Sequence, residues 1–131
     1  QQLLIRRMVE DLRVPTEIMT VPTARERDGI AMSSRNRYLN PEQRQAATVL
    51  SRALAMAEQG VREGERDSSR IRQILRKTVE SEAGVRLDYA EVVDSRTLET
   101  LERIEPGREA VALLAAWLGE TRLIDNAILT E

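Results

Sequence analysis

Two apolar runs near the end of the chain, joined by a short polar step, restrict the fold more than any other feature. Residues 109–118 and 122–129 are rich in strand-forming side chains, and Gly119-Glu120 separates them. A two-residue connection that contains Gly is typical of a β-hairpin, because Gly readily adopts the backbone conformation of a tight turn. The alternation over residues 87–93 is typical of a further strand. The sequence therefore predicts three strands in one antiparallel sheet.

Two helical patterns precede the apolar hairpin. Asn40 and Pro41 form a good N-cap and first-turn pair, and apolar side chains then recur at helical spacing toward Gly60. A second helical pattern covers residues 71–79 and closes at Gly84. Helices packed on one face of the sheet would bury these apolar positions. We therefore predict an α+β fold in which two helices cover a small antiparallel three-stranded sheet.

The first 22 residues have a different pattern. Apolar residues over positions 4–12 have helical spacing, and residues 16–21 are enriched in Ile, Val and Thr before Pro22. A helix followed by a strand is the kind of unit that closes a parallel sheet. We therefore predict a helix-strand remnant of a larger fold at residues 1–22, with its N-terminal partner missing, and a separate domain at residues 23–131.

The chain of 131 residues contains neither His nor Cys. The lack of Cys excludes disulfides and thiolate nucleophiles and agrees with a cytoplasmic location. Without His, no side chain naturally titrates near neutral pH, so we expect the chain alone to lack general acid–base catalysis. Acidic residues such as Glu10-Asp11, Glu63, Glu65 and Asp67 are expected to be solvated, and we predict no metal ligand.

Charge and hydropathy exclude two further classes. A formal net charge of -2 argues against a nucleic-acid binder held by bulk charge. No apolar run approaches the roughly 20 residues of a membrane helix, and no signal sequence opens the chain. We therefore expect a soluble protein without nucleic-acid or membrane partners.

The aperiodic segment at residues 23–39 carries the candidate chemistry. Guanidinium groups bind phosphate oxygens bidentately, Ser hydroxyls add short hydrogen bonds, and a Gly-containing turn exposes backbone N–H groups. Such a set suits a polyphosphate ligand. The alternative, a solvated Arg-rich loop, stays open on composition alone. The arginines that flank Gly29 and Met32-Ser33-Ser34 are Arg25, Arg27, Arg35 and Arg37.

The same segment resembles a family signature. Pantothenate synthetases place between their two domains a signature that is similar, nearly residue for residue, to Asp28-Gly29-Ile30-Ala31-Met32-Ser33-Ser34-Arg35-Asn36-Arg37-Tyr38-Leu39. Residues 21–23, Arg25-Glu26, Gly107-Arg108 and residues 121–126 also resemble that family. The resemblance spans essentially the whole chain and is far longer than a short-motif match.

The resemblance implies a ligase that adenylates pantoate with ATP and Mg²⁺, releases pyrophosphate, and lets beta-alanine displace AMP to give pantothenate. In that family the segment that Met32-Ser33-Ser34-Arg35 resembles is the counterpart of the mobile nucleotide-binding loop of class I aminoacyl-tRNA synthetases. By that resemblance these four residues contact ATP, and Ser33, Ser34 and Arg35 hold its phosphates. Ala24, at the domain junction, is expected to offer its backbone to the adenine.

The resemblance also implies a pantoate ligand at the start of the chain. The family usually has three residues between a Gln-Gln pair and Ile-Arg, whereas this chain has Leu3 and Leu4 before Ile5-Arg6. Counting back without a gap gives Gln1 as the pantoate ligand, and matching the pair gives Gln2. The alternative is that both amides lie on a helix surface at a frayed terminus.

The chain departs from the family in what it lacks. The family's His-x-Gly-His segment and its Mg²⁺ contacts belong to an N-terminal Rossmann-like domain. We therefore expect residues 1–22 to be the end of that domain and residues 23–131 to be the complete C-terminal lid, hinged near residues 21–24. The chain alone is expected to be inactive, with no catalytic residue of its own. The full-length protein is expected to be a homodimer through the missing domain.

Two other classes compete with this interpretation. The Arg-rich loop would suit a nucleic-acid-binding appendage, and the apolar hairpin would suit an assembly module whose strands pair between chains. Asp125 and Asn126 match the family but are expected to be structural. Trp117 and Tyr89 are expected to be core residues or cross-strand pairs.

Overall fold

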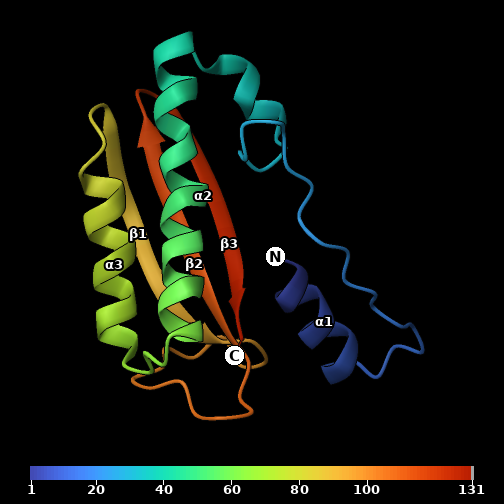
Figure 1. Cartoon of the computed structure of the whole chain (residues 1–131). Coiled ribbons are helices and arrows are strands. Elements are labelled where there is room, and N and C mark those ends of the chain that lie inside the picture. The colour runs from blue at the N-terminus through green and yellow to red at the C-terminus, as the bar shows by residue number, and fades with distance from the viewer. Residues whose placement is uncertain (131) are drawn as a thin grey trace.

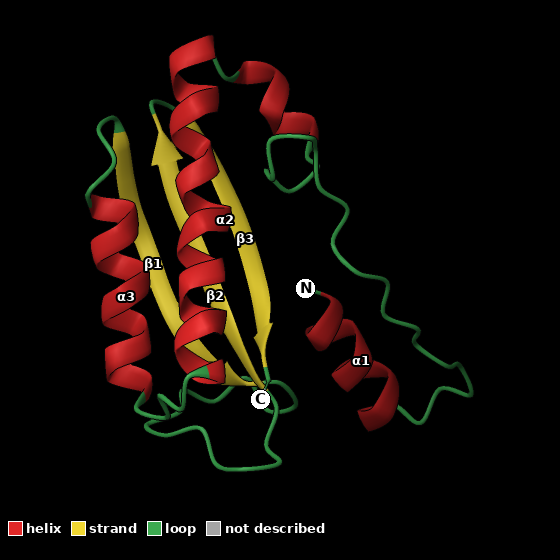
Figure 2. Cartoon of the chain, in the orientation of Figure 1, coloured by secondary structure: helices red, strands yellow, loops and turns green. Residues whose placement is uncertain are grey.

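The computed structural model describes residues 1–130. None of the helices in that range is long and apolar enough to cross a membrane. The predicted α+β class is confirmed (Figures 1 and 2). The elements are α1 (Gln2–Asp11), the 3-10 helix η1 (Ser34–Tyr38), α2 (Pro41–Arg62), α3 (Ser68–Glu80), β1 (Val85–Asp94), β2 (Ala110–Leu118) and β3 (Thr121–Leu129).

The strands form one antiparallel sheet in the order β1-β2-β3. Leu118 pairs with Thr121 at the end of the β2–β3 ladder, so Gly119-Glu120 is the connection that the apolar runs predicted. Gly119 has a φ of 58°, a left-handed conformation that Gly adopts without strain. The short turn therefore fixes the register of the two longest apolar runs.

The core lies between the sheet and two helices. Helices α2 and α3 pack against each other and against one face of the sheet, as predicted (Figure 1). Alternate side chains of a strand point to one face, and on β2 the buried set includes Ala112, Leu114 and Ala116. Removal of this apolar surface from water is the main force that stabilises the body. The helices contribute Val49, Leu54, Ile71, Leu75 and Val79 to the same core.

A capping box fixes the start of α2. The Asn40 side chain accepts the backbone N–H of Gln43 at 2.8 Å, and the Gln43 side chain accepts the backbone N–H of Asn40 at 3.1 Å. Pro41 occupies the first turn, where its missing N–H leaves no bond unmade. The N-cap that the sequence predicted is therefore confirmed.

The opposite face of the sheet carries aromatic residues paired with arginines. Trp117 pairs in register with Arg86, whose guanidinium lies 5.5 Å from the Trp117 ring centroid. The guanidinium of Arg122 on β3 lies 5.7 Å from the Tyr89 ring centroid. Trp117 and Tyr89 were predicted to be core residues or cross-strand pairs, and the structure has Trp117 opposite Arg86 and Tyr89 opposite Ala115. Each ring also gains a cation–π contact.

Residues 16–21 do not form the predicted strand. They run as extended, irregular backbone with no strand partner among residues 1–130. A strand exists through hydrogen bonds to a neighbouring strand, so β-rich composition alone cannot make one. The helix of this unit is confirmed as α1, which has no buried residue and lies outside the helix–sheet body (Figure 1).

Candidate functional site

Residues 24–32 form a hydrogen-bonded turn at the start of the aperiodic segment. Met32 donates its backbone N–H to the Ala24 carbonyl at 2.9 Å, and Glu26 donates to the Ile30 carbonyl at 2.8 Å. Gly29, within the turn, has a φ of 87°, which favours Gly. The turn brings Ala24 beside Met32, and the sequence predicted that both contact one nucleotide.

The predicted phosphate-binding residues lie at the start of η1. The Ser33 hydroxyl oxygen accepts the backbone N–H of Arg35 at 3.2 Å and so caps η1. Ser33, Ser34 and Arg35 are exposed, and Met32 before them is 66% exposed. An unbranched apolar side chain at that exposure contributes little to the core. These side chains are therefore accessible to a ligand, and of the four only Ser33 has a role in the fold, as the cap of η1.

A pocket of about 210 Å³ lies between this segment, α2 and β3. Met32, Ser33 and Arg35 line it, whereas Ala24 and Ser34 are not among its lining residues. The structure thus brings three of the predicted nucleotide residues to one pocket. The remaining walls come from Ile30, Ala31, Asn36, Ala47, Leu50 and residues 122–125.

Arg25 is held by an ion pair to the sheet. Its guanidinium nitrogens donate to both carboxylate oxygens of Asp125, at 2.6 and 3.0 Å. The Asp125 side chain is 3% exposed, and its hydrogen bonds hold the pKa of Arg25 above the ordinary value. Arg25 is therefore a structural cation, and of the two alternatives left open for the four arginines, phosphate binding is not the one that its contacts favour. The structural role expected for Asp125 is confirmed.

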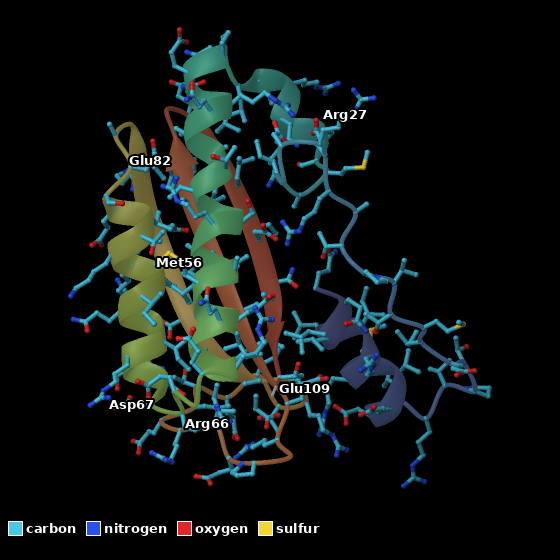
Figure 3. The ribbon with its side chains drawn as sticks, viewed as in Figure 1. Arg27, Met56, Arg66, Asp67, Glu82 and Glu109 are labelled. Atoms are coloured by element: carbon cyan, nitrogen blue, oxygen red, sulfur yellow. The ribbon has the colours of Figure 1, made fainter. Side chains whose placement is uncertain are left out.

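The other three arginines of the segment stay on its surface. Arg37 donates to the Tyr38 hydroxyl at 2.8 Å and lies 4.9 Å from that ring centroid. Arg27 points away from the body (Figure 3), and within residues 1–130 neither Arg27 nor Arg35 has a side-chain hydrogen bond or ion pair. Two of the predicted phosphate-binding cations, Arg27 and Arg35, are thus free to meet an anion.

Glu26 joins the signature segment to α2. Its carboxylate accepts hydrogen bonds from Asn36 Nδ2 and from Arg44, each at 2.6 Å, and these bonds lower the pKa of Glu26. Arg44 also pairs with Asp28 at 2.7 Å. Asn36 is buried, and its Oδ1 has no hydrogen-bond partner in the described range. The segment is therefore clamped from its buried side while its outer side stays free.

Comparison with known proteins identifies the family. A family model described as pantoate-beta-alanine ligase matches residues 1–128. The chain belongs to the pantoate-beta-alanine ligase family. The resemblance drawn from residues 28–39 is thereby confirmed.

Relatives of this ligase family are similar along nearly the whole chain. Pantothenate synthetases from Pelotomaculum thermopropionicum and Moorella thermoacetica are 50% and 48% identical, over 131 and 129 residues. Those alignments cover 100% and 98% of this chain but 46% and 45% of the relatives, so the chain spans about half their length. A crystal structure of pantothenate synthetase from Thermus thermophilus matches with a TM-score of 0.84 and 38% identity, over 96% of this chain and 45% of that chain.

The glutamines that the family resemblance assigns to pantoate lie on α1, outside the lining of the pocket at Met32. Gln1 is the N-cap of α1, is exposed, and makes no side-chain capping bond. Gln2 Nε2 donates to Thr20 Oγ1 at 3.0 Å, and Arg6 donates to the same oxygen at 2.6 Å. The choice between Gln1 and Gln2 as a pantoate ligand therefore stays a prediction.

The sequence analysis gave no role to Glu26 or Asn36, which hold the segment in place. Their contact joins two points of an aperiodic loop, and no helical or strand period indicates such a pair. The available signal for Asn36 was its place as an amide between two arginines in the middle of the signature. Its burial could not be inferred without the position of α2.

Proposed function

We propose that this chain is the C-terminal part of a pantothenate synthetase that condenses pantoate with beta-alanine, using ATP and forming pantoyl adenylate. In this proposal residues 1–22 end the nucleotide-binding domain and residues 23–131 form the lid that closes over it. The family match over residues 1–128 and relatives of about twice this length support the assignment to part of a longer enzyme. The division is supported by α1, which has no buried residue and lies outside the helix–sheet body.

One observation carries the nucleotide-binding role: the outer side of the signature segment is exposed, while its buried side is held by hydrogen bonds. Ser33, Ser34 and Arg35 are exposed beside a pocket, while a hydrogen bond between Glu26 and Asn36 holds the segment on its buried side. Fixed donors cost little to reorganise when charge develops nearby, so a clamped loop can stabilise a phosphate transition state. Ala24 and Met32, side by side in the turn, are proposed to face the adenine.

The proposed reaction has two steps. A pantoate carboxylate oxygen attacks the α-phosphorus of ATP, and the bond to the pyrophosphate oxygen breaks. Arg35 and the hydroxyls of Ser33 and Ser34 neutralise charge on the leaving pyrophosphate. The beta-alanine amine then attacks the acyl carbon of the adenylate, AMP leaves, and the amide of pantothenate forms. Closure of the lid excludes water that would hydrolyse the adenylate.

The residues that line the pocket at Met32 do not fit the Mg²⁺ that the family resemblance implies, because the one carboxylate among them, Asp125, is bonded through both oxygens to Arg25. Within residues 1–130 no group of three or more His, Cys, Asp or Glu residues is arranged to hold a metal ion. Mg²⁺ is held by carboxylates together with substrate phosphates. We therefore assign no metal ligand to this chain, and its residues act on the phosphates directly.

Product formation tests the proposal. The full-length parent protein is supplied with ATP, pantoate, beta-alanine and Mg²⁺, and residues 1–131 alone are assayed beside it. The parent should form AMP and pantothenate in equal amounts, and residues 1–131 alone should form neither. A folded parent that forms no AMP would contradict the substrate assignment. Turnover by residues 1–131 alone would contradict the division between lid and catalytic domain.

A further inference from the structure

Asp125 places a charge between two apolar neighbours on β3. It lies on the helix-facing side of β3 between Leu123 and Ala127, which are both buried. Removing a carboxylate from water is unfavourable unless it is paired, and apolar residues of similar size are often at least as stabilising. The stability of the sheet therefore gives no reason for an acid at this position.

The partner of Asp125 supplies the reason. Arg25 lies 100 positions earlier in the chain and donates to both oxygens of Asp125, at 2.6 and 3.0 Å. A bidentate pair between a guanidinium and a carboxylate fixes orientation as well as distance. Asp125 Oδ1 also accepts the backbone N–H of Asn126 at 2.8 Å, which holds the carboxylate in place. The pair thus ties one defined point of the loop to the middle of β3.

Arg25 also bonds directly to the signature segment. Arg25 donates to the Gly29 carbonyl at 3.1 Å and forms an isolated bridge with Ala31. The residues on either side, Ala24 and Met32, share a backbone hydrogen bond. Packing does not hold the exposed residues that follow, and a pocket of about 210 Å³ adjoins them and residues 122–125 of β3.

We propose that Asp125 is a positioning residue for the nucleotide. Through Arg25 it fixes the turn at residues 24–32 relative to the sheet, so that Met32 to Arg35 begin in the geometry that closes on ATP. The proposal rests on the nucleotide-binding function proposed above. Asp125 touches no substrate in this scheme, and its effect is on where the phosphate-binding side chains lie.

Asp125→Asn and Arg25→Lys test the role in the full-length protein. Asp125→Asn removes the charge, and Arg25→Lys keeps a charge but loses the second hydrogen bond. Since a misplacement of about 1 Å can cost about a hundred-fold, we expect Asp125→Asn to raise KM for ATP by roughly ten- to a hundred-fold. KM for beta-alanine should not change. Arg25→Lys should give a smaller rise in KM for ATP.

Asp94→Asn is the matched control. Asp94 pairs with Arg108 at 2.6 Å, and its side chain is 8% exposed, so this ion pair is also short and largely buried. Asp94 pairs with Ala110 near the far end of the sheet and does not line the pocket at Met32. Asp94→Asn should lower the melting temperature but leave KM for ATP unchanged.

An unchanged KM for ATP in Asp125→Asn, with a melting temperature lowered as in Asp94→Asn, would overturn the proposal. If Asp125→Asn does not fold, KM for ATP and the melting temperature of Arg25→Lys test the proposal instead. Hydrogen exchange at the Met32 amide gives a second reading without turnover: it should accelerate in Asp125→Asn and stay unchanged in Asp94→Asn. Equal Met32 exchange in wild type and Asp125→Asn would refute the tether. A wild-type parent without AMP formation would instead refute the proposed function.

Discussion

The helix–sheet body and the segment at residues 23–39 are held by different forces. In the body, regularly spaced apolar side chains such as Leu54 and Leu114 are fully buried between helices and sheet. In the segment, directed bonds of Arg25, Glu26 and Asn36 set the backbone. A packed body spreads each change over many contacts, whereas a loop held by a few hydrogen bonds moves when one atom is changed. The contrast predicts that body variants lose stability and segment variants lose nucleotide affinity.

The largest expected effect is in the body. Leu114→Ala removes a fully buried side chain from the middle strand and should lower the free energy of unfolding by about 2–5 kcal/mol. Ile128→Ala, at a position that is 48% exposed on the same sheet, should lower it much less. Urea unfolding of both variants measures the difference. Equal losses would show that the helix-facing side is not the main core.

A polar anchor within the body should affect stability with a defined pH dependence. The backbone N–H of Thr97 and the Arg108 side chain lower the pKa of Asp94 to about 2. Because the folded pKa lies below the unfolded value, this contribution is complete above about pH 4 and disappears as the pH falls toward 2. Asp94→Asn should lower the free energy of unfolding at pH 7 by about 1–3 kcal/mol.

The free energy of unfolding of wild type and of Asp94→Asn, measured between pH 7 and pH 2, checks the direction of this pH dependence. The difference between the two proteins should be constant near neutral pH and shrink below pH 4. A difference that grows as the pH falls would contradict the assigned role of the Asp94 carboxylate.

A smaller effect is expected when the clamp of the segment is weakened. Glu26→Gln keeps the shape but loses the charge that Asn36 and Arg44 share. We expect Glu26→Gln to raise KM for ATP in the full-length protein by roughly ten-fold, because a loop that is no longer clamped holds its phosphate-binding donors less well. Glu82→Gln is the control, because Glu82 pairs with Arg52 at 2.9 Å and lies far from Arg27 (Figure 3). Similar KM values for the two variants would count against the clamp.

The smallest predicted change in the free energy of unfolding is at Asn40, where the segment at residues 23–39 meets α2. Asn40→Ala removes the N-cap of α2 and should lower the free energy of unfolding by about 1 kcal/mol. Asn40→Gly should lower it by only a few tenths, because Gly is tolerated at an N-cap. Thermal unfolding of both variants shows which substitution lowers the stability more. A larger loss for Asn40→Gly than for Asn40→Ala would argue against the capping box.

The body was predictable because its elements carry local signals. Asn40-Pro41 indicates a helix start, and Gly119-Glu120 between apolar runs indicates a hairpin. Residues 16–21 have the composition of a strand but no neighbouring strand to bond with in the described range. Local composition therefore failed where the structure depends on a distant partner.

The site was predictable in part for a related reason. The sequence predicted an aperiodic loop at Ser33, Ser34 and Arg35. The structure has these residues exposed, but Ser34 and Arg35 belong to the 3-10 helix η1. Loop composition could not distinguish Arg25 from Arg35, because the carboxylate that pairs with Arg25 lies 100 positions away on β3; only the family resemblance singled out Arg35. Which arginine faces a ligand is decided by tertiary pairing and not by loop composition.

Pantoate-dependent exchange of labelled pyrophosphate into ATP, in the full-length protein, tests the central claim most directly. It isolates adenylation from the later attack by beta-alanine. Arg35→Ala should slow this exchange by about a hundred- to a thousand-fold, as expected when one donor to a developing charge is lost. Arg62→Ala, an exposed arginine at the end of α2, should leave it unchanged. Equal exchange in Arg35→Ala and wild type would contradict the claim that this loop binds the phosphates of ATP.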